Sequence, residues 1–179
     1  DPEVQTGMQA YNKGMAYLLE QMEGMYITMA ISPLFPSQYA HSRRIACDAW
    51  AGIGDTEYTL NSLTYGWWLN QVYTYNDPDH LLLEPVSDGE NRARITSGVI
   101  TGIFMNGDDL SCISGIQVAK DKARKFLTNK DINAIAKMGK SFRPVNGNMD
   151  GADFLFMHDT GKEVYLAAFY YSGYDLTYD

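Results

Sequence analysis

The sequence has few cysteines, no long hydrophobic run and little positive charge. Its only cysteines are Cys47 and Cys112, which form no Cys-x-x-Cys pair, so neither a disulfide scaffold nor a cysteine-based zinc site is predicted. No stretch of about 18 consecutive apolar residues occurs, and a membrane-spanning helix requires one. Lysine and arginine total 14 against 22 aspartate and glutamate residues, which gives a formal net charge of −8. This balance argues against nucleic acid and against an anionic membrane as partners.

The overall composition is that of a folded domain. Hydrophobic residues make up 45% and charged residues 20% of the 179 positions, which is ordinary for a globular protein. This length suffices for one domain or for part of a larger one. The 13 tyrosines and 3 tryptophans suit a sugar-binding surface, but they suit the core of a β domain equally well.

Helical and extended patterns alternate along residues 3–110. Apolar residues at helical spacing predict a helix over 3–21 with one buried face, and further helices beginning near Asp55 and Glu90. Strands are predicted at 25–32, 44–48, 72–75 and 103–106, and the first of them is apolar enough to be buried on both faces. The alternation predicts right-handed βα units around a parallel sheet, and therefore an α/β fold.

Polar residues stand at the end of each predicted strand or just after it: Ser32, Asp48, Asp77 with Asp79, and Asp108 with Asp109. In a (β/α)₈ barrel the catalytic groups gather at the C-terminal ends of the strands. Four strands make half of such a barrel, because a complete one needs roughly 250 residues. Half a barrel leaves two sheet edges open, so we expect the missing half or self-association to be needed for stability.

The pattern changes toward the C-terminus. Helices are predicted over 116–127 and 131–138, and strands over 153–157 and 163–169 form a β-hairpin around Thr160-Gly161. No further βα alternation follows. The sequence therefore predicts a partial barrel over residues 1–140 and the start of an antiparallel β domain over 141–179, with the boundary near 139–145.

The stretch from Arg44 to Trp50 is the candidate for chemistry. In an extended strand Arg44, Ala46 and Asp48 share one face, and this face ends on a carboxylate. Buried strands rarely carry Arg and Asp together unless the charges face a cleft or pair with each other. Two interpretations stay open: a carboxylic acid with a cation and an indole beside it to hold a sugar, or a structural Arg–Asp pair.

Four segments occur in an order that resembles one group of enzymes. They are Arg44-Ile45-Ala46-Cys47-Asp48, Asn76-Asp77-Pro78-Asp79, the stretch from Glu90-Asn91-Arg92 to Gly107-Asp108-Asp109-Leu110, and Leu127–Ile135. The chain resembles the clan-D glycoside hydrolases, the α-galactosidases and their relatives in glycoside hydrolase families 27 and 36. Over about residues 25–145, this resemblance implies strands five to eight of a (β/α)₈ barrel followed by a β domain.

The resemblance also implies roles for individual residues. Asp48 would be the general acid/base and Arg44 would bind the sugar ring. The position of His80 lines the pocket, and Ser32 and Trp50 are further expected substrate contacts at the strand ends. Three other acids are expected to orient their neighbours: Asp77, Asp79 and Asp109. The implied substrate is a terminal α-galactoside-type glycoside, the implied location is secreted or periplasmic, and no cofactor or metal is expected.

Retaining hydrolysis needs a second carboxyl group roughly 5–5.5 Å from the first. The family's nucleophile stands on the fourth barrel strand, which would precede Asp1, and no Lys-x-Asp motif occurs among these residues. We therefore expect the chain alone to be inactive. The acid also needs a raised pKa, so we expect the charge of Arg44 to face the sugar hydroxyls more than Asp48.

Two alternatives use the same residues differently. A non-catalytic carbohydrate-binding or structural fragment would need the aromatic rings and acids but no proton transfer. A Ca²⁺ site could use Asp77-x-Asp79 with His80, or Asp108-Asp109, although neither has the spacing of an EF-hand loop. Cys47 is expected to be a small packed thiol.

Overall fold

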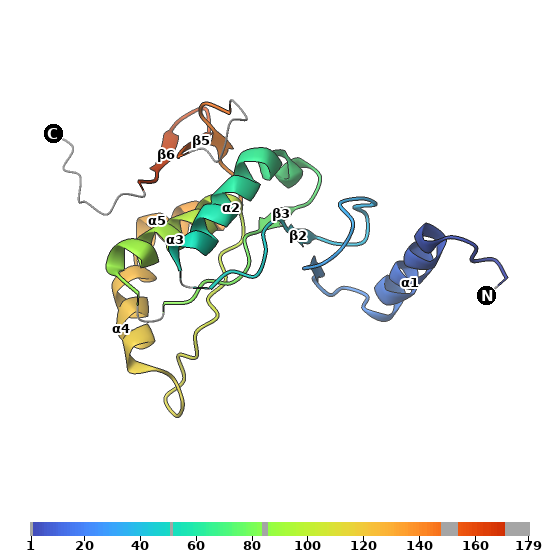
Figure 1. Ribbon diagram of the computed structural model, residues 1–179, viewed down its shortest axis with the longest axis horizontal. Coiled ribbons are helices and arrows are strands. Elements are labelled where there is room, and N and C mark those ends of the chain that lie inside the picture. The colour runs from blue at the N-terminus through green and yellow to red at the C-terminus, as the bar shows by residue number, and fades with distance from the viewer. Residues whose placement is uncertain (1, 51, 84–85, 148–153, 171–179) are drawn as a thin grey trace.

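The computed structural model describes residues 2–50, 52–83, 86–147 and 154–170. The molecule is elongated, with α1 at one end and α4, α5 and the β5–β6 hairpin toward the other (Figure 1). The helices are α1 Gly7–Gln21, α2 Ile53–Gly66, the 3₁₀ helix η1 Trp67–Gln71, α3 Asp88–Thr101, α4 Gln117–Phe126 and α5 Lys130–Lys137. The strands are β1 Thr28–Met29, β2 Ser42–Arg44, β3 Tyr75–Asp77, β4 Arg143–Pro144, β5 Leu155–Asp159 and β6 Val164–Ala168.

The first sheet is parallel, as the βα alternation predicts. Its order is β1-β2-β3, and Arg44 lies opposite Asp77 in the register. Residues 103–107 extend the hydrogen bonding of this sheet alongside residues 76–81. The N–H of Ile103 donates to Asn76 O at 3.0 Å, and the N–H of Leu81 donates to Met105 O at 2.9 Å. Closure into a barrel stays a prediction.

The strands are shorter than the sequence pattern predicts. The predicted strands 25–32, 44–48 and 72–75 become 28–29, 42–44 and 75–77, and 103–106 contributes only the bridge between Leu81 and Asn106. After Arg44 one more ladder bond follows, from the N–H of Ile45 to Asp77 O. The chain then leaves the sheet, so Asp48 lies beyond the strand instead of on it.

Two of the described helices begin at a capping box. In this motif the side chain of the residue before the helix accepts the N–H of the residue three positions later, whose side chain accepts the first residue's N–H in return. Thr6 and Gln9 form the box of α1, and Ser87 and Glu90 form the box of α3. Helix α2, predicted to begin near Asp55, begins at Ile53 and has no such box. Gly52 precedes that helix without a side-chain bond, and the carboxylate of Asp55 instead accepts the N–H of Trp50 at 3.0 Å.

The predicted buried face of α1 is also wrong. No residue of α1 is buried, and Met8 and Tyr17 are 50% and 64% exposed. The helix touches the rest of the described chain through Tyr11, whose ring packs edge-on against Tyr39 at 6.0 Å, and through Asn12, which accepts the Tyr39 hydroxyl. The apolar stripe therefore forms at helical spacing without the cover that would bury it. No helix among the described residues is both long and apolar enough to cross a membrane.

The second sheet is antiparallel and has the order β4-β5-β6, which confirms the predicted hairpin. The predicted strand 153–157 begins at Asp153, which lies outside the described residues. A single apolar cluster joins this sheet to α2 and α3, and its buried members are Leu60, Leu63, Ile100, Phe142, Phe156, Ala167 and Phe169. The hairpin thus shares its core with the helices. The division into two domains at residue 140 stays a prediction.

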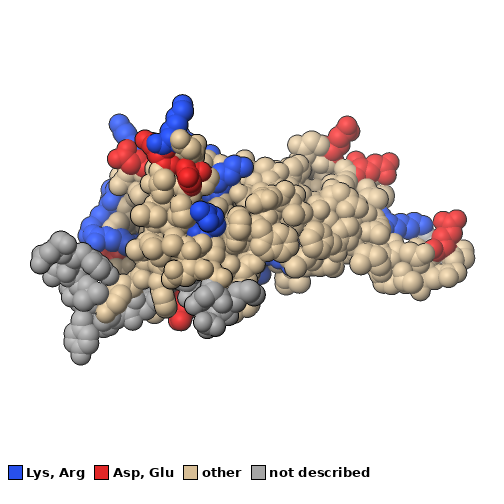
Figure 2. All heavy atoms as spheres, turned by 90° about the horizontal axis from the view of Figure 1, so that it is seen from above, with Lys and Arg blue, Asp and Glu red and all other residues tan. Residues whose placement is uncertain are grey.

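Charged side chains gather at the two ends of the face drawn in Figure 2, and the middle of that face carries few. The net negative charge of the chain is therefore not displayed as one acidic patch on this face.

We expect Phe156→Ala to destabilise the hairpin and the helices together. The ring is fully buried in the shared cluster, and deleting such a ring costs about 3–5 kcal/mol. Thermal unfolding followed by circular dichroism should show one transition at a lower temperature. Val164→Ala, at an exposed position of β6, should leave that temperature nearly unchanged. Separate transitions for strands and helices would contradict the shared core.

Candidate functional site

Charged groups meet where the chain leaves β2 and β3. The guanidinium of Arg44 contacts two carboxylates: Nη2 lies 2.8 Å from Asp48 Oδ1, and Nη1 lies 3.2 Å from Asp79 Oδ1. The side chains of Arg44 and Asp79 are 12% and 11% exposed, whereas that of Asp48 is 68% exposed. Burial lowers the pKa of Arg44, but Asp79 and Asp48 outweigh it and raise that pKa overall. One arginine therefore contacts a buried carboxylate and an exposed one.

Asp79 is held in an unusual backbone conformation. Its φ of +70° is in the left-handed region, which non-glycine residues seldom occupy. Its N–H donates to Asp77 Oδ1 at 2.7 Å, and its own Oδ2 accepts the N–H of Ala49 at 2.7 Å. Burial raises the pKa of Asp79, but the hydrogen bonds from Ala49 and His80 and the charges of His80 and Arg44 lower it below its usual value. Asp79 is thus kept ionised.

The pKa of Asp77 is shifted in the direction opposite to that of Asp79. It is 3% exposed at the end of β3, and burial raises its pKa. The negative charge of Asp79 adds to this rise, while the hydrogen bond from the Asp79 N–H and the charges of Arg44 and Arg94 oppose it. The two neighbouring acids therefore have pKa values shifted in opposite directions.

An aromatic pair lies beside the ion pairs. The rings of Trp50 and His80 pack edge to face with their centroids 5.5 Å apart, and His80 Nδ1 is 3.3 Å from Asp79 Oδ1. Trp50 is 56% exposed and presents much of its indole to solvent. A Cβ at Gly107 would lie 2.6 Å from His80 Cδ2, so only glycine leaves room for this ring. The sequence pattern gave no role to Gly107.

A hollow of about 550 Å³ opens next to Asp48. Its lining includes Ser32, Arg44 and Asp48, together with Cys47 and Tyr58. Trp50 and His80 are not part of this lining. Cys47 is exposed, so its prediction as a packed thiol is wrong, because the chain has already left the sheet at that position.

Two further site predictions concern the orientation of Arg44 and the position of Asp109, and the first of them is wrong. The charge of Arg44 does not avoid Asp48, since the two groups form the 2.8 Å ion pair that the structural interpretation predicts. Asp109 lies in the next polar loop, where its carboxylate accepts the Ser111 N–H at 2.8 Å and the Ser114 hydroxyl at 2.5 Å. These bonds lower the pKa of Asp109 to about 2. The orienting role that the sequence analysis expected for Asp109 stays a prediction, and its contacts are local to this loop.

Arg94 is a component of the site that the sequence pattern missed. It lies fully buried on α3, and its Nη2 donates to Pro78 O at 3.1 Å and to His80 O at 2.8 Å. Polar residues recur at helical spacing on this helix, at Asn91, Arg94, Ser97 and Thr101, and all four are fully buried. This buried polar stripe is the sequence signal that could have identified Arg94.

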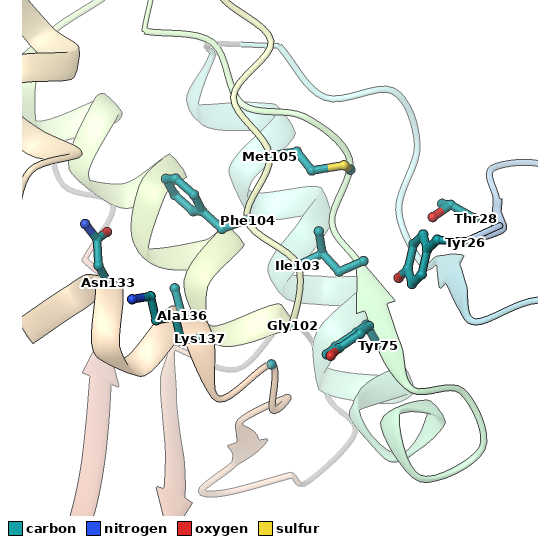
Figure 3. Close-up of a pocket in the computed structure, with 11 residues that line it drawn as sticks. Tyr26, Thr28, Tyr75, Gly102, Ile103, Phe104, Met105, Asn133, Ala136 and Lys137 are labelled. Atoms are coloured by element: carbon teal, nitrogen blue, oxygen red, sulfur yellow. The ribbon is translucent and has the colours of Figure 1, made fainter. Parts of the chain in front are cut away.

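A second hollow of about 550 Å³ lies between β1, β3 and α5 (Figure 3). Tyr26, Tyr75 and Ile103 face one side of it, and Asn133 and Lys137 of α5 lie toward the other. Among the described residues, its lining contains no carboxylate, whereas the hollow beside Asp48 contains one.

Within the described ranges, no three His, Cys, Asp or Glu side chains are grouped so that they could hold a metal ion. The Ca²⁺ interpretation of Asp77, Asp79 and His80 also competes with bonds already made. One oxygen of Asp79 accepts the Ala49 N–H, and the other contacts Arg44 and His80.

The sequence matches no protein-family model, and searches of curated proteins and of solved structures return no match.

Replacing either of the two neighbouring acids by asparagine should change stability differently. Asp79→Asn removes a charge-assisted contact to Arg44, so we expect a loss of about 2 kcal/mol at pH 7, or about 4–8 °C in Tm. Because the folded pKa of Asp79 is lowered, its contribution is full above the unfolded value near 3.9 and is lost as pH falls through the folded value.

Asp77→Asn keeps the acceptor for the Asp79 N–H and removes a buried charge. Because burial raises the folded pKa of Asp77, its ionised form costs stability at pH 7, and this cost disappears as pH falls through the raised value. We expect Asp77→Asn to leave Tm at pH 7 unchanged or to raise it by up to about 4 °C. Thermal unfolding between pH 3 and 7 checks both variants, and a fall in Tm for Asp77→Asn would contradict this assignment.

Gly107→Ala should displace His80 from Trp50, because the new methyl group would overlap the imidazole. In fluorotryptophan-labelled protein the ¹⁹F signal of Trp50 should shift, while those of Trp67 and Trp68 stay in place. Gly14→Ala is the control, since a Cβ there meets nothing within 4 Å. An unmoved Trp50 signal in Gly107→Ala would show that the ring has room.

Proposed function

We propose that this chain carries the acid/base half of a retaining glycoside hydrolase site for terminal α-galactoside-type sugars. The observation that supports it most directly is the Arg44 guanidinium that joins Asp48 and Asp79 at the ends of parallel strands. The exposed indole of Trp50 and the imidazole of His80 lie beside it and offer apolar and polar contacts for a sugar ring. The resemblance to clan-D glycoside hydrolases adds the assignment of Asp48.

Under this proposal the two carboxylates have separate tasks. Asp79 is buried and bound on both oxygens, so it anchors the guanidinium of Arg44. Asp48 is exposed, and its ion-pair partner within the described ranges is Arg44, so Asp48 would turn toward a glycosidic oxygen while Arg44 stays in place. Sugar hydroxyls would replace Asp48 on the guanidinium, and the separation from Arg44 would let Asp48 hold a proton. The nucleophile would be a carboxylate outside residues 1–179.

Asp48 would then protonate the leaving group, and a supplied nucleophile makes this step measurable. Azide would attack the anomeric carbon, the bond to the aryl oxygen would break, and Asp48 would pass its proton to that oxygen. The products are β-galactosyl azide and the phenol. Without azide we expect no hydrolysis by the purified chain, because water lacks the carboxylate partner that the retaining mechanism uses.

The leaving group decides whether Asp48 acts as an acid. Asp48→Asn should slow azide transfer from phenyl α-galactoside by about 100-fold or more, because phenol departs poorly without a proton. Transfer from 2,4-dinitrophenyl α-galactoside should fall by less than about tenfold. Asp121→Asn is the matched control, since Asp121 is an exposed acid that pairs with Arg124 on α4. Equal losses on both substrates, or no azide product from the wild-type chain, would refute the general-acid role.

Arg44 should act in binding. Arg44→Lys keeps the charge but loses the planar fork that contacts two groups at once. Titration with methyl α-galactoside, followed by the ¹⁹F signal of Trp50, should give affinity weakened by about tenfold, or ~1.4 kcal/mol. Arg92→Lys, at an exposed position of α3, should bind as the wild type does. Equal affinities for the wild type and Arg44→Lys would remove Arg44 from the sugar site.

A non-catalytic sugar-binding chain is the second candidate, and the Arg44–Asp48 ion pair favours it. A carboxylate held by a cation is a poor proton donor. This candidate predicts galactoside binding without any azide product, so the two experiments above separate it from the enzyme.

A further inference from the structure

The turn that carries Asp79 and His80 rests on a buried cation. Arg94 has no exposed surface, and its Nη2 donates to the carbonyls of Pro78 and His80, with the carbonyl of Asp79 at 3.5 Å. Bonds from a charged donor are stronger than neutral ones, and carbonyls left without a partner in a buried site are costly. The backbone of residues 78–80 therefore takes its position from Arg94.

The same guanidinium ties the turn to two helices. Nη1 of Arg94 lies 3.2 Å from the hydroxyl of Ser97 on α3 and 3.4 Å from that of Thr59 on α2. A planar fork can serve both helices and the turn at once, whereas a lysine amine is a single point. The arginine thus fixes the turn relative to the helices that also carry the apolar core.

The position of this turn decides where the side chains of the site lie. Asp79 reaches Arg44 from a left-handed backbone conformation, and His80 reaches Trp50 edge to face. Both contacts need the turn to keep its present course. We infer that Arg94 is a positioning residue, which holds the 78–80 turn so that Asp79 anchors Arg44 and His80 packs on Trp50. Its consequence for sugar chemistry rests on the proposed function, but the placement itself does not.

Among the described residues, no carboxylate forms an ion pair with the buried Arg94, which fits this role. Burial lowers its pKa, and the charges of Asp79, Asp55 and Asp77 act at longer range to oppose that effect. A residue selected only to make an ion pair would contact one of these acids. Arg94 instead donates to backbone carbonyls, and these bonds fix the position of the 78–80 turn.

The test reads the Trp50–His80 contact directly. In fluorotryptophan-labelled chain, His80→Ala sets the Trp50 ¹⁹F position for a lost contact. Arg94→Met should move the Trp50 signal to that position, while the signals of Trp67 and Trp68 stay in place. Arg94→Lys, which can restore part of the carbonyl contacts, should give a Trp50 signal between the wild-type and His80→Ala positions.

Two controls separate positioning from general loss of stability. Arg92→Met removes an exposed arginine from the same helix and should leave the Trp50 signal unmoved. Val99→Ala removes two buried methyl groups from the apolar core on α3. It should lower Tm and leave the Trp50 signal unmoved. A folded Arg94→Met whose Trp50 signal keeps the wild-type position would overturn the inference. If Arg94→Met does not fold, Arg94→Lys decides by the same signal.

The azide assay links the placement to chemistry. A misplaced turn should slow azide transfer by about 100-fold in Arg94→Lys, with Arg92→Met unaffected. If the wild-type chain forms no galactosyl azide, the enzyme assignment fails, while the Trp50 shift still tests the positioning role. If the wild-type chain transfers azide but the Trp50 signal does not move in the Arg94 variants, the positioning role fails and the proposed function stands.

Discussion

The contact on which the site depends is the one between Arg44 and Asp79. The register of β2 against β3 places Arg44 opposite Asp77, and the turn after β3 then brings the Asp79 carboxylate within 3.2 Å of the guanidinium. The turn is held from two directions, because Arg94 binds its carbonyls from the helices and Arg44 binds its carboxylate from the sheet. Both arginines are largely buried, so each depends on these partners to remain in the protein interior.

This arrangement combines a buried part of the site with an exposed part. Asp79 is fixed by Ala49, His80 and Arg44, and its pKa is lowered as a result. Asp48 is exposed, and its ion-pair partner among the described residues is Arg44. A site built this way can keep its cation in place while one carboxyl group changes partner, which is what general-acid chemistry beside a sugar requires. A rigid ion pair between Arg44 and Asp48 alone would not allow this.

The sequence pattern predicted the parallel sheet, most helices and the hairpin, because these depend on apolar periodicity and on turns. It overestimated the strands, since apolar runs such as 25–32 continue after the backbone has left the ladder. It also expected α1 to be covered, which depends on a partner surface that periodicity cannot show. Arg94 and Gly107 were missed because their roles arise from contacts with a distant turn. The strand-end argument, which needs only the order of parallel strands, placed Asp48 near Asp79. Arg44 and Trp50 followed from their nearness to Asp48 in the sequence, and His80 followed from the resemblance alone.

The most direct test of Arg44 and Asp48 as a sugar site is a crystal structure of this chain with methyl α-galactoside bound. We expect the sugar to lie in the hollow beside Asp48, with its hydroxyls on the Arg44 guanidinium in place of Asp48. Asp79 should keep its contact with Arg44, and the Asp48 carboxyl group should lie about 3 Å from the glycosidic oxygen. A sugar bound elsewhere, or an Arg44–Asp48 pair that stays intact beside a bound sugar, would contradict the account.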